Sequence, residues 1–282
     1  MHNIIVPTDF SIKSYNALRL AKRIASGTRG VIHIVHVVEP VSGQYSSMGE
    51  NLGSTLDDVY IVQLVEKLTE ELQNLKALNE GHDHQILSYI KVGDPYCEIK
   101  EMVEHLKADI IIVGAKGFMD AEEFFLGSIT DKLVRTAPCP VITVKEVIDE
   151  GSFQNIVYAT DLEADNKPMM NLLMRLQDLF DAQLHLVMVN TPKNFHNDID
   201  TQRRMEQLVQ HYQLKNYTLN IYNHEDREYG IVYFADGKQA DLIAMGVHEQ
   251  SGFRRLISGG SLADEVTEHT FRPVLTYRTN LQ

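Results

Sequence analysis

Short apolar runs alternate with longer amphipathic segments along the first half of the chain. The runs are nearly continuous and rich in β-branched residues, as in strands that are buried on both faces of a parallel sheet. They predict strands at residues 4–6, 31–37, 85–91, 110–113 and 141–144. The segments between them have helical periodicity and predict helices at residues 14–25, 59–78, 96–106 and 129–136. This alternation predicts an α/β fold with right-handed crossovers, in which ligands bind beyond the carboxyl ends of the strands.

The same pattern occurs a second time. Residues 3–9 (NIIVPTD) resemble residues 155–161 (NIVYATD) at an offset of 152, and residues 109–114 resemble 241–246 at an offset of 132. The second copy is therefore 20 residues shorter in its middle. The excess in the first copy, residues 41–60, is rich in Ser, Gly, Asn and Asp and is predicted to be a long loop. We predict two Rossmann-like domains, at residues 1–147 and 153–282, each with a five-stranded parallel sheet flanked by helices.

Composition narrows the possible functions. The chain has 26 Lys and Arg against 39 Asp and Glu, and both halves are acidic, which argues against nucleic-acid binding. Neither a signal peptide nor a long apolar membrane segment is evident, so we expect a cytoplasmic protein with no membrane association. The two cysteines do not have zinc-ligand spacing, and the His82–His84 pair lacks an evident third ligand, so no metal site is expected.

A glycine motif follows the fourth predicted strand. Gly114, Gly117, Gly127 and Ser128 have the spacing G-x2-G-x9-G-S, which differs from the P-loop and from the dinucleotide fingerprint. Glycines at a strand end let the backbone turn sharply near a ligand, and free N–H groups at the next helix start can hold phosphate oxygens. Ser128 with Asp131 also fits simple helix capping.

The glycine motif and four further segments together resemble the universal stress protein family in its tandem two-domain form. These segments are residues 6–11 (VPTDFS), 36–40 (HVVEP), 93–95 (GDP) and 137–141 (APCPV), in the order that the family has. They span nearly the whole first half of the chain. The resemblance implies the adenine nucleotide alpha hydrolase-like version of the Rossmann-like fold and an ATP-type site in the first domain.

The resemblance also implies roles for particular residues. Asp9 would hydrogen-bond the ribose or adenine, Pro7 would shape its loop, and Val37 would contact adenine through its backbone. The ribose and phosphate path would be lined by Val113, Gly114, Lys116 and Gly117, and the phosphates would be held by Gly127, Ser128 and Ile129. Asp9 could instead be an ordinary turn former at a strand end.

The loop between the second and third glycines departs from the family pattern. It carries Asp120, Glu122 and Glu123, where relatives often have basic residues. These charges would weaken the binding of a triphosphate unless Mg²⁺ or solvent screens them. ADP or AMP therefore remains an alternative to ATP.

The second copy departs further. Its candidates for the same roles are Asp161, Gly246, Gly260 and Ser261. The second glycine is replaced by Glu249, and the loop is one residue longer. We interpret this copy as a degenerate site.

The leading hypothesis is a nucleotide-binding stress-response protein that acts as a sensor or regulator. Without an evident general base or arginine finger, we expect no catalytic residues and at most slow ATP hydrolysis. The alternatives are a nucleotide-free interaction scaffold and an ATP-using enzyme. Related enzymes that activate substrates with ATP often have a Ser-Gly-Gly-x-Asp-Ser type loop after the first strand. This chain has PTDFS at residues 7–11, which argues against the enzyme alternative. Since family members pair through their last strands, we expect an internal pseudo-dimer. A further homodimer and an unidentified regulatory protein partner are also compatible with the sequence.

Overall fold

A computed structural model describes seven segments of the 282-residue chain. They are residues 1–39, 53–79, 83–115, 128–146, 153–162, 167–248 and 262–279. The remaining residues lie outside the described structure.

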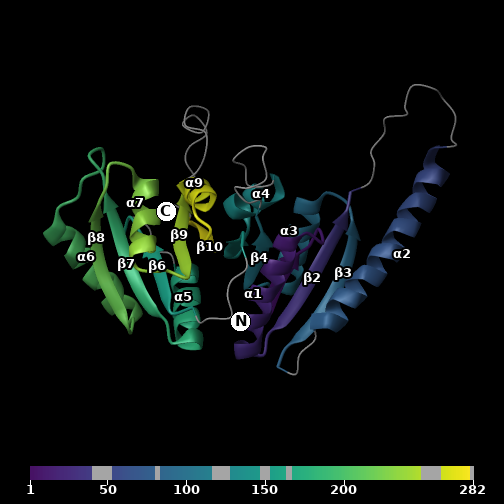
Figure 1. The fold of residues 1–282 in the computed structure, drawn as a ribbon, viewed down its shortest axis with the longest axis horizontal. Coiled ribbons are helices and arrows are strands. Elements are labelled where there is room, and N and C mark those ends of the chain that lie inside the picture. The colour runs from purple at the N-terminus through teal and green to yellow at the C-terminus, as the bar shows by residue number, and fades with distance from the viewer. Residues whose placement is uncertain are drawn as a thin grey trace.

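Strands and helices alternate throughout both halves of the chain (Figure 1). Domain 1 consists of β1 (Asn3–Pro7), α1 (Ile12–Thr28), β2 (Val31–Val38), α2 (Gly53–Asn79), β3 (Gln85–Val92), α3 (Pro95–Leu106), β4 (Ile110–Gly114), α4 (Ser128–Thr136) and β5 (Val141–Val144). Domain 2 consists of β6 (Asn155–Ala159), α5 (Lys167–Phe180), β7 (Gln183–Asn190), α6 (Asp198–Tyr212), β8 (Tyr217–Asn223), α7 (Arg227–Gly237), β9 (Leu242–His248), α9 (Leu262–His269) and β10 (Val274–Thr279). The two tandem α/β domains that the repeat predicts are thereby confirmed.

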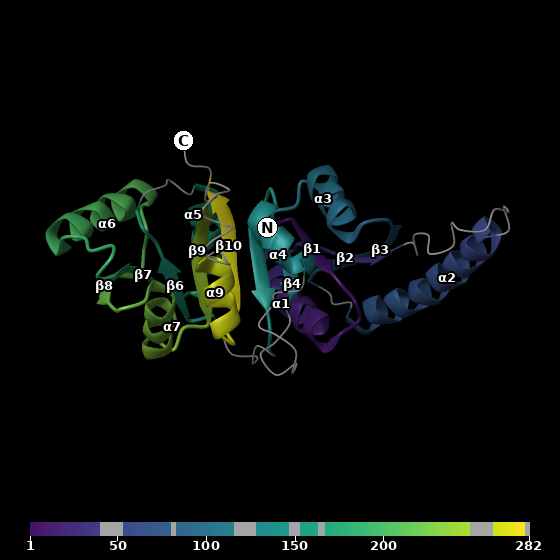
Figure 2. The same cartoon turned by 90° about the horizontal axis from the view of Figure 1, so that it is seen from above.

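The ten strands form one continuous sheet in the order β3-β2-β1-β4-β5-β10-β9-β6-β7-β8. Within each domain the neighbouring strands are parallel, whereas β5 and β10 are antiparallel, with Ile142 opposite Leu275. The two five-stranded sheets are thus joined through the last strand of each domain, the contact expected from the resemblance. β3 and β8 lie at the two ends of the molecule, near α2 and α6 (Figures 1 and 2).

The sheet separates two apolar cores, and each core continues from one domain into the other. One core contains buried side chains of α1, α2, α5 and α6, and the other contains buried side chains of α3, α4, α7 and α9. Alternate residues of the central strands enter the two cores, so that Ile4 lies in the first and Ile5 in the second. Burial on both faces explains why these strands are nearly continuous apolar runs.

All of the strands and helices predicted in domain 1 are present, with differences of one to three residues at most ends. One prediction is wrong: residues 53–60, expected to belong to a long loop, form the first turns of α2. The remainder of that stretch, residues 41–52, lies outside the described structure. Polar residues in this segment suggested a loop, but Ser, Asp and Gly are tolerated in a first helical turn.

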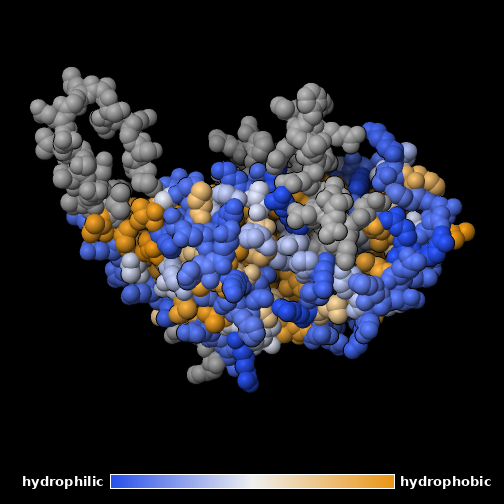
Figure 3. Space-filling model, turned by 180° about the vertical axis from the view of Figure 1, so that it is seen from behind, coloured by the Kyte–Doolittle hydropathy of each residue, from blue (hydrophilic) through white to orange (hydrophobic). Residues whose placement is uncertain are grey.

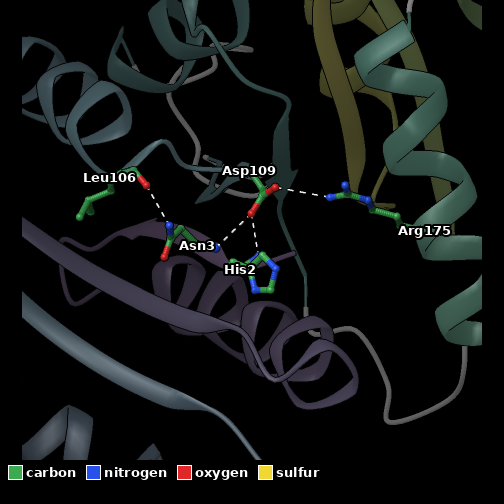
Figure 4. A network of polar contacts seen from close by, with 5 residues as sticks. All are labelled: His2, Asn3, Leu106, Asp109 and Arg175. Carbon is green, nitrogen blue, oxygen red and sulfur yellow. Dashed lines mark hydrogen bonds and ion pairs between the residues drawn. The ribbon is translucent and has the colours of Figure 1, made fainter.

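Polar contacts also join the two domains on the side of α1 and α5. Asp109, just before β4, accepts hydrogen bonds from the backbone N–H groups of His2 and Asn3 and lies 3.4 Å from Nη1 of Arg175 on α5 (Figure 4). Arg23 on α1 lies over the ring of Phe153, 5.4 Å from its centroid. Arg23 and Arg175 occupy equivalent positions in the two copies, so the repeat supplies both sides of this contact with a cation.

None of the helices in the described part of the chain is both long and apolar enough to cross a bilayer. On the face seen in Figure 3, hydrophilic side chains predominate and apolar side chains form separate small groups.

Candidate functional site

A cavity of about 230 Å³ lies where the carboxyl ends of β1, β2 and β4 meet the first turns of α1, α3 and α4. Its lining residues come from all of these elements and are Pro7, Thr8, Asp9, Ser14, Val35, His36, Val37, Glu39, Pro95, Ile99, Val113, Gly114, Ile129 and Thr130. The cavity is therefore at the edge of the sheet where α/β folds bind their ligands.

The loop from β1 to α1 is held by a network of short polar side chains. The Thr8 hydroxyl accepts a hydrogen bond from Phe10 N (3.1 Å) and donates one to the Ser14 hydroxyl (3.1 Å). Ser11 caps the helix by accepting from Ser14 N. Phe10 has a left-handed backbone (φ 62°), which turns the chain sharply between strand and helix. The network fixes the place of Asp9 at the mouth of the cavity.

Asp9 is exposed, and its Oδ1 accepts a hydrogen bond from Ser11 N at 3.0 Å. Partial burial acts to raise the pKa of Asp9, but hydrogen bonds from Ser11 and Ser14 outweigh it and keep the pKa below its usual value. The side chain is therefore a carboxylate at neutral pH and can accept further hydrogen bonds from a ligand.

His36 and Val37 form the wall contributed by β2. Nδ1 of His36 donates a hydrogen bond to the Thr8 carbonyl at 2.7 Å. The ring packs 4.9 Å from that of Phe10. Val37 is half-buried and Glu39 is exposed at the end of the strand.

The opposite wall consists of the first turns of α3 and α4. Asp94 caps α3 by accepting from Cys97 N (2.8 Å), and Pro95 occupies the first helical position beside the cavity. Thr130 Oγ1 donates to the Gly114 carbonyl at 3.3 Å and so ties α4 to the end of β4.

Gly114 allows close packing of α1 against β4, independently of any ligand. A Cβ atom at this position would lie 2.6 Å from the carbonyl carbon of Lys13 and 2.8 Å from Ser14 N. Because these are backbone atoms, a larger residue would push the start of α1 away from β4. This glycine lets the helix, strand and cavity approach one another.

The structure brings together six of the residues expected at the site. They are Pro7, Asp9, Val37, Val113, Gly114 and Ile129. Ser128 is the exposed first residue of α4, next to this group, but it is not among the lining residues described. Lys116, Gly117 and Gly127, and the acidic residues Asp120, Glu122 and Glu123, lie outside the described structure, as do Gly260 and Ser261 of the second copy.

Sequence reasoning missed several lining residues. Thr8 carries a visible signal, since Thr160 repeats it together with the following aspartate. His36 and Pro95 belong to segments that resemble the family, but no role was assigned to either of them. Ile99 gives no signal beyond helical periodicity, because its position in the cavity depends on the packing of α3.

Domain 2 repeats the turn but uses its aspartate differently. Thr160 accepts from Leu162 N (3.1 Å), and Leu162 is left-handed (φ 61°), as Phe10 is in domain 1. Oδ2 of Asp161, however, lies 3.7 Å from Nη2 of Arg227, the first residue of α7. Gly246 lies in β9 and is half-buried.

Comparison with known proteins gives consistent results for the whole chain. The model of the family described as "Universal stress protein family" matches residues 1–145 and again residues 152–278. A universal stress protein of Methanocaldococcus jannaschii is 31% identical over 143 residues, which are 51% of this chain and 81% of that protein. One of Synechocystis sp. is 25% identical over 296 residues, covering 99% of this chain and 100% of that protein.

A crystal structure of a universal stress protein from Archaeoglobus fulgidus has the same fold. It matches with a TM-score of 0.73 at 18% identity and covers 98% of both chains.

Proposed function

This chain belongs to the universal stress protein family, and from that premise we propose that domain 1 binds one adenine nucleotide and that its occupancy regulates a protein partner. We place the domains at residues 1–147 and 153–282, with the nucleotide site in the first.

The cavity at the ends of β1, β2 and β4 carries this proposal. Residues that are distant in sequence, Pro7, Val37 and Gly114, line one hollow at the edge of the sheet where this class of fold binds ligands. These residues belong to separate sequence motifs, so their convergence supports a common ligand for them.

The charges of the cavity indicate which part of a nucleotide it holds. Its described lining residues include two carboxylates, Asp9 and Glu39, but no lysine or arginine. Carboxylates favour the hydroxyl and amino donors of a nucleoside and repel phosphate. We therefore assign the ribose and adenine to this cavity, with Asp9 and the backbone of Val37 as their partners.

The phosphates would extend toward the start of α4, where Ser128 and Ile129 present the helix N-terminus. Lys116, Gly117 and Gly127 belong to the same proposal through the glycine motif. Mg²⁺ would offset the repulsion between a triphosphate and the nearby carboxylates. ATP is the leading ligand, and ADP and AMP are its alternatives.

A regulatory role requires ligand binding but no chemical step. Binding that differs between two conformations or partner states is enough to make a sensor.

The experiment compares two variants at equivalent positions. Small molecules are released from the purified full chain by heat and identified by mass spectrometry, and the affinity for added Mg-ATP is measured by calorimetry. Loss of a hydrogen bond to a charged group costs about 1.5–3 kcal/mol, so we expect Asp9→Asn to weaken binding by about 10- to 100-fold. Asp161→Asn is the matched control in domain 2 and should leave the affinity within about twofold of the wild-type value.

Wild-type protein that carries no nucleotide and does not respond to ATP, ADP or AMP would refute this function. In that case the interaction-scaffold hypothesis would take its place.

A further inference from the structure

We infer that Arg227 closes the second site, because its guanidinium lies against Asp161, whereas the equivalent aspartate of domain 1 is exposed to a ligand. This inference rests on the proposed function of domain 1, since it concerns the corresponding place in the other copy. It makes the protein a tandem with one open and one self-occupied site.

Arg227 occupies the same position in domain 2 as Pro95 does in domain 1. Both are the first residue of a helix that an aspartate caps, Asp94 in α3 and Asp226 in α7. Pro95 lines the open cavity of domain 1. In domain 2 the long side chain at this position reaches across the strand ends and places Nη2 3.7 Å from Oδ2 of Asp161.

The residues around this ion pair are more deeply buried than their counterparts in domain 1. Asp9 is exposed, whereas the side chain of Asp161 is 18% exposed. Val37 is half-buried, whereas Val189 is 4% exposed. Positions that are open in the first copy are therefore covered in the second.

Helix α7 itself contributes to the covering. Gly230 packs so closely on β7 that a Cβ atom there would lie 2.6 Å from Cγ1 of Val189, the counterpart of Val37. Domain 1 has Glu98 at the equivalent place and accommodates its full side chain, which extends toward Lys91. The glycine lets α7 cover the valine that would otherwise face a base.

Two further side chains fasten the loops at the same edge. Arg204 on α6 donates a hydrogen bond to the carbonyl of Leu162, in the turn that carries Asp161. Asn190, buried at the end of β7, donates to the carbonyl of His196 (3.1 Å) and accepts from its N–H (3.2 Å). Side chains of domain 2 thus hold the surrounding loops and complete the closure.

The physical consequence is competition for one carboxylate. A ribose or adenine donor can reach Asp161 only after Arg227 has moved away, so the apparent affinity is reduced by the small fraction of molecules in which it has. Removing the guanidinium removes this competition, and proline is the residue that domain 1 tolerates at this helical position.

The test uses the full chain with ¹³C-methyl methionine and adenosine as the probe. Met245 is the counterpart of Val113 and lies in the same apolar core, on the face of the sheet covered by α7 and α9. Its methyl signal therefore reports on domain 2, while calorimetry with Mg-ATP reports on domain 1. The test variants are Arg227→Pro and Arg227→Ala. Two variants serve as controls: Arg227→Lys retains the cation, and Arg203→Ala removes an exposed arginine of a different helix, α6.

In wild type, Arg227→Lys and Arg203→Ala, we expect the Met245 signal to stay fixed as adenosine is added. In Arg227→Pro or Arg227→Ala it should shift and saturate at adenosine concentrations that leave the wild-type signal unchanged. Circular dichroism and an unchanged domain 1 affinity show that the variants are folded.

A Met245 signal that responds in wild type, or that stays fixed in both folded variants, would overturn the inference. Failure of the proposed function can be distinguished from failure of this inference. It would appear as the absence of Mg-ATP binding to the wild-type protein, independently of the Met245 signal.

Discussion

The two domains share one fold and begin with a similar sequence pattern. The aspartate that the repeat places at the same position in each domain nevertheless has different contacts. Asp9 lies exposed at the mouth of a cavity of about 230 Å³. Asp161, at the same place in the repeat, lies 3.7 Å from Arg227. A side chain on a neighbouring helix therefore distinguishes the surroundings of the two aspartates.

A second difference concerns how the helices on that face are joined. In domain 1 the hydroxyl groups of Tyr96 and Thr136 are 2.7 Å apart and form a neutral hydrogen bond between α3 and α4. In domain 2 the equivalent residues are Glu228 and His269, and the Glu228 carboxyl group contacts Nδ1 of His269 between α7 and α9. Burial raises the pKa of Glu228, with His269 opposing that rise and Asp226 adding to it. Duplication has thus kept the contact between helices while changing its chemistry.

The largest effect is expected from Gly114→Val in the open domain. The new side chain would collide with backbone atoms of Lys13 and Ser14, so the start of α1 must move. Overpacking of this kind costs about 1–3 kcal/mol, and the cavity would lose its shape. We expect denaturant unfolding to show this loss and calorimetry to show a drop in Mg-ATP affinity of at least about 100-fold.

The control for that variant is Gly237→Ala, at the end of α7, where an added Cβ atom meets nothing within 4 Å. It should leave both quantities nearly unchanged. A Gly114→Val protein with wild-type stability and affinity would show that the close approach of α1 does not matter.

An intermediate effect is expected when the two helix contacts are cut. His269→Ala leaves the carboxyl group of Glu228, a buried residue, without its histidine partner. This should cost about 1–3 kcal/mol. Tyr96→Phe should cost only about 0.5–1.5 kcal/mol, since the Thr136 hydroxyl also donates to the Lys132 carbonyl. Urea unfolding of the two variants measures the difference, and equal costs would contradict the distinction between the carboxyl–imidazole contact of domain 2 and the hydroxyl–hydroxyl contact of domain 1.

The smallest effect concerns a feature in which the domains are alike. His33 and His185 are equivalent, buried and hydrogen-bonded to Asn3 and Asn155 respectively. Burial lowers the pKa of both, and Lys238 adds to this effect at His185. The unfolded chain therefore binds protons more readily, so the stability that these neutral rings contribute is full above about pH 6.5 and decreases as the pH falls below it.

We expect His33→Gln and His185→Gln each to flatten the decline of the unfolding free energy between about pH 6.5 and 5. The double variant should flatten it further, because the two sites are far apart and independent. Urea unfolding at a series of pH values checks this, and a decline as steep in the double variant as in wild type would show that these rings do not titrate on unfolding.

Much of the fold could be predicted because the strands are buried on both faces and therefore stand out as apolar runs. The repeat offset of 152 pairs Asp9 with Asp161, and the same offset makes Val189 the counterpart of Val37. The prediction for the start of α2 was wrong because its first turns are polar, and both loops and the first turns of helices are often polar. In addition, the register of the outer strand pair differs between the domains. Ile32 pairs with Ile86, whereas Leu184, the counterpart of Ile32, pairs with Tyr217, which lies one residue before the position that the offset of 132 assigns to Ile86.

The site was predictable where a motif marked it and unpredictable where packing created it. Pro7, Asp9 and Gly114 follow strands and carry recognisable turn chemistry. The closure of domain 2 could not be foreseen, because Arg227 and Asp161 are 66 residues apart in sequence. Their encounter depends on how α7 packs against β7, beside the turn that follows β6, which only the folded structure supplies.

The most direct test of an open and a closed domain in one chain is the number of nucleotides bound at saturation. Native mass spectrometry of the full chain, titrated with ATP and Mg²⁺, counts them. We predict one nucleotide per chain in wild type and in Asp161→Asn, and markedly reduced occupancy in Asp9→Asn. Two nucleotides per wild-type chain, or an occupancy that depends on Asp161 and not on Asp9, would contradict the account.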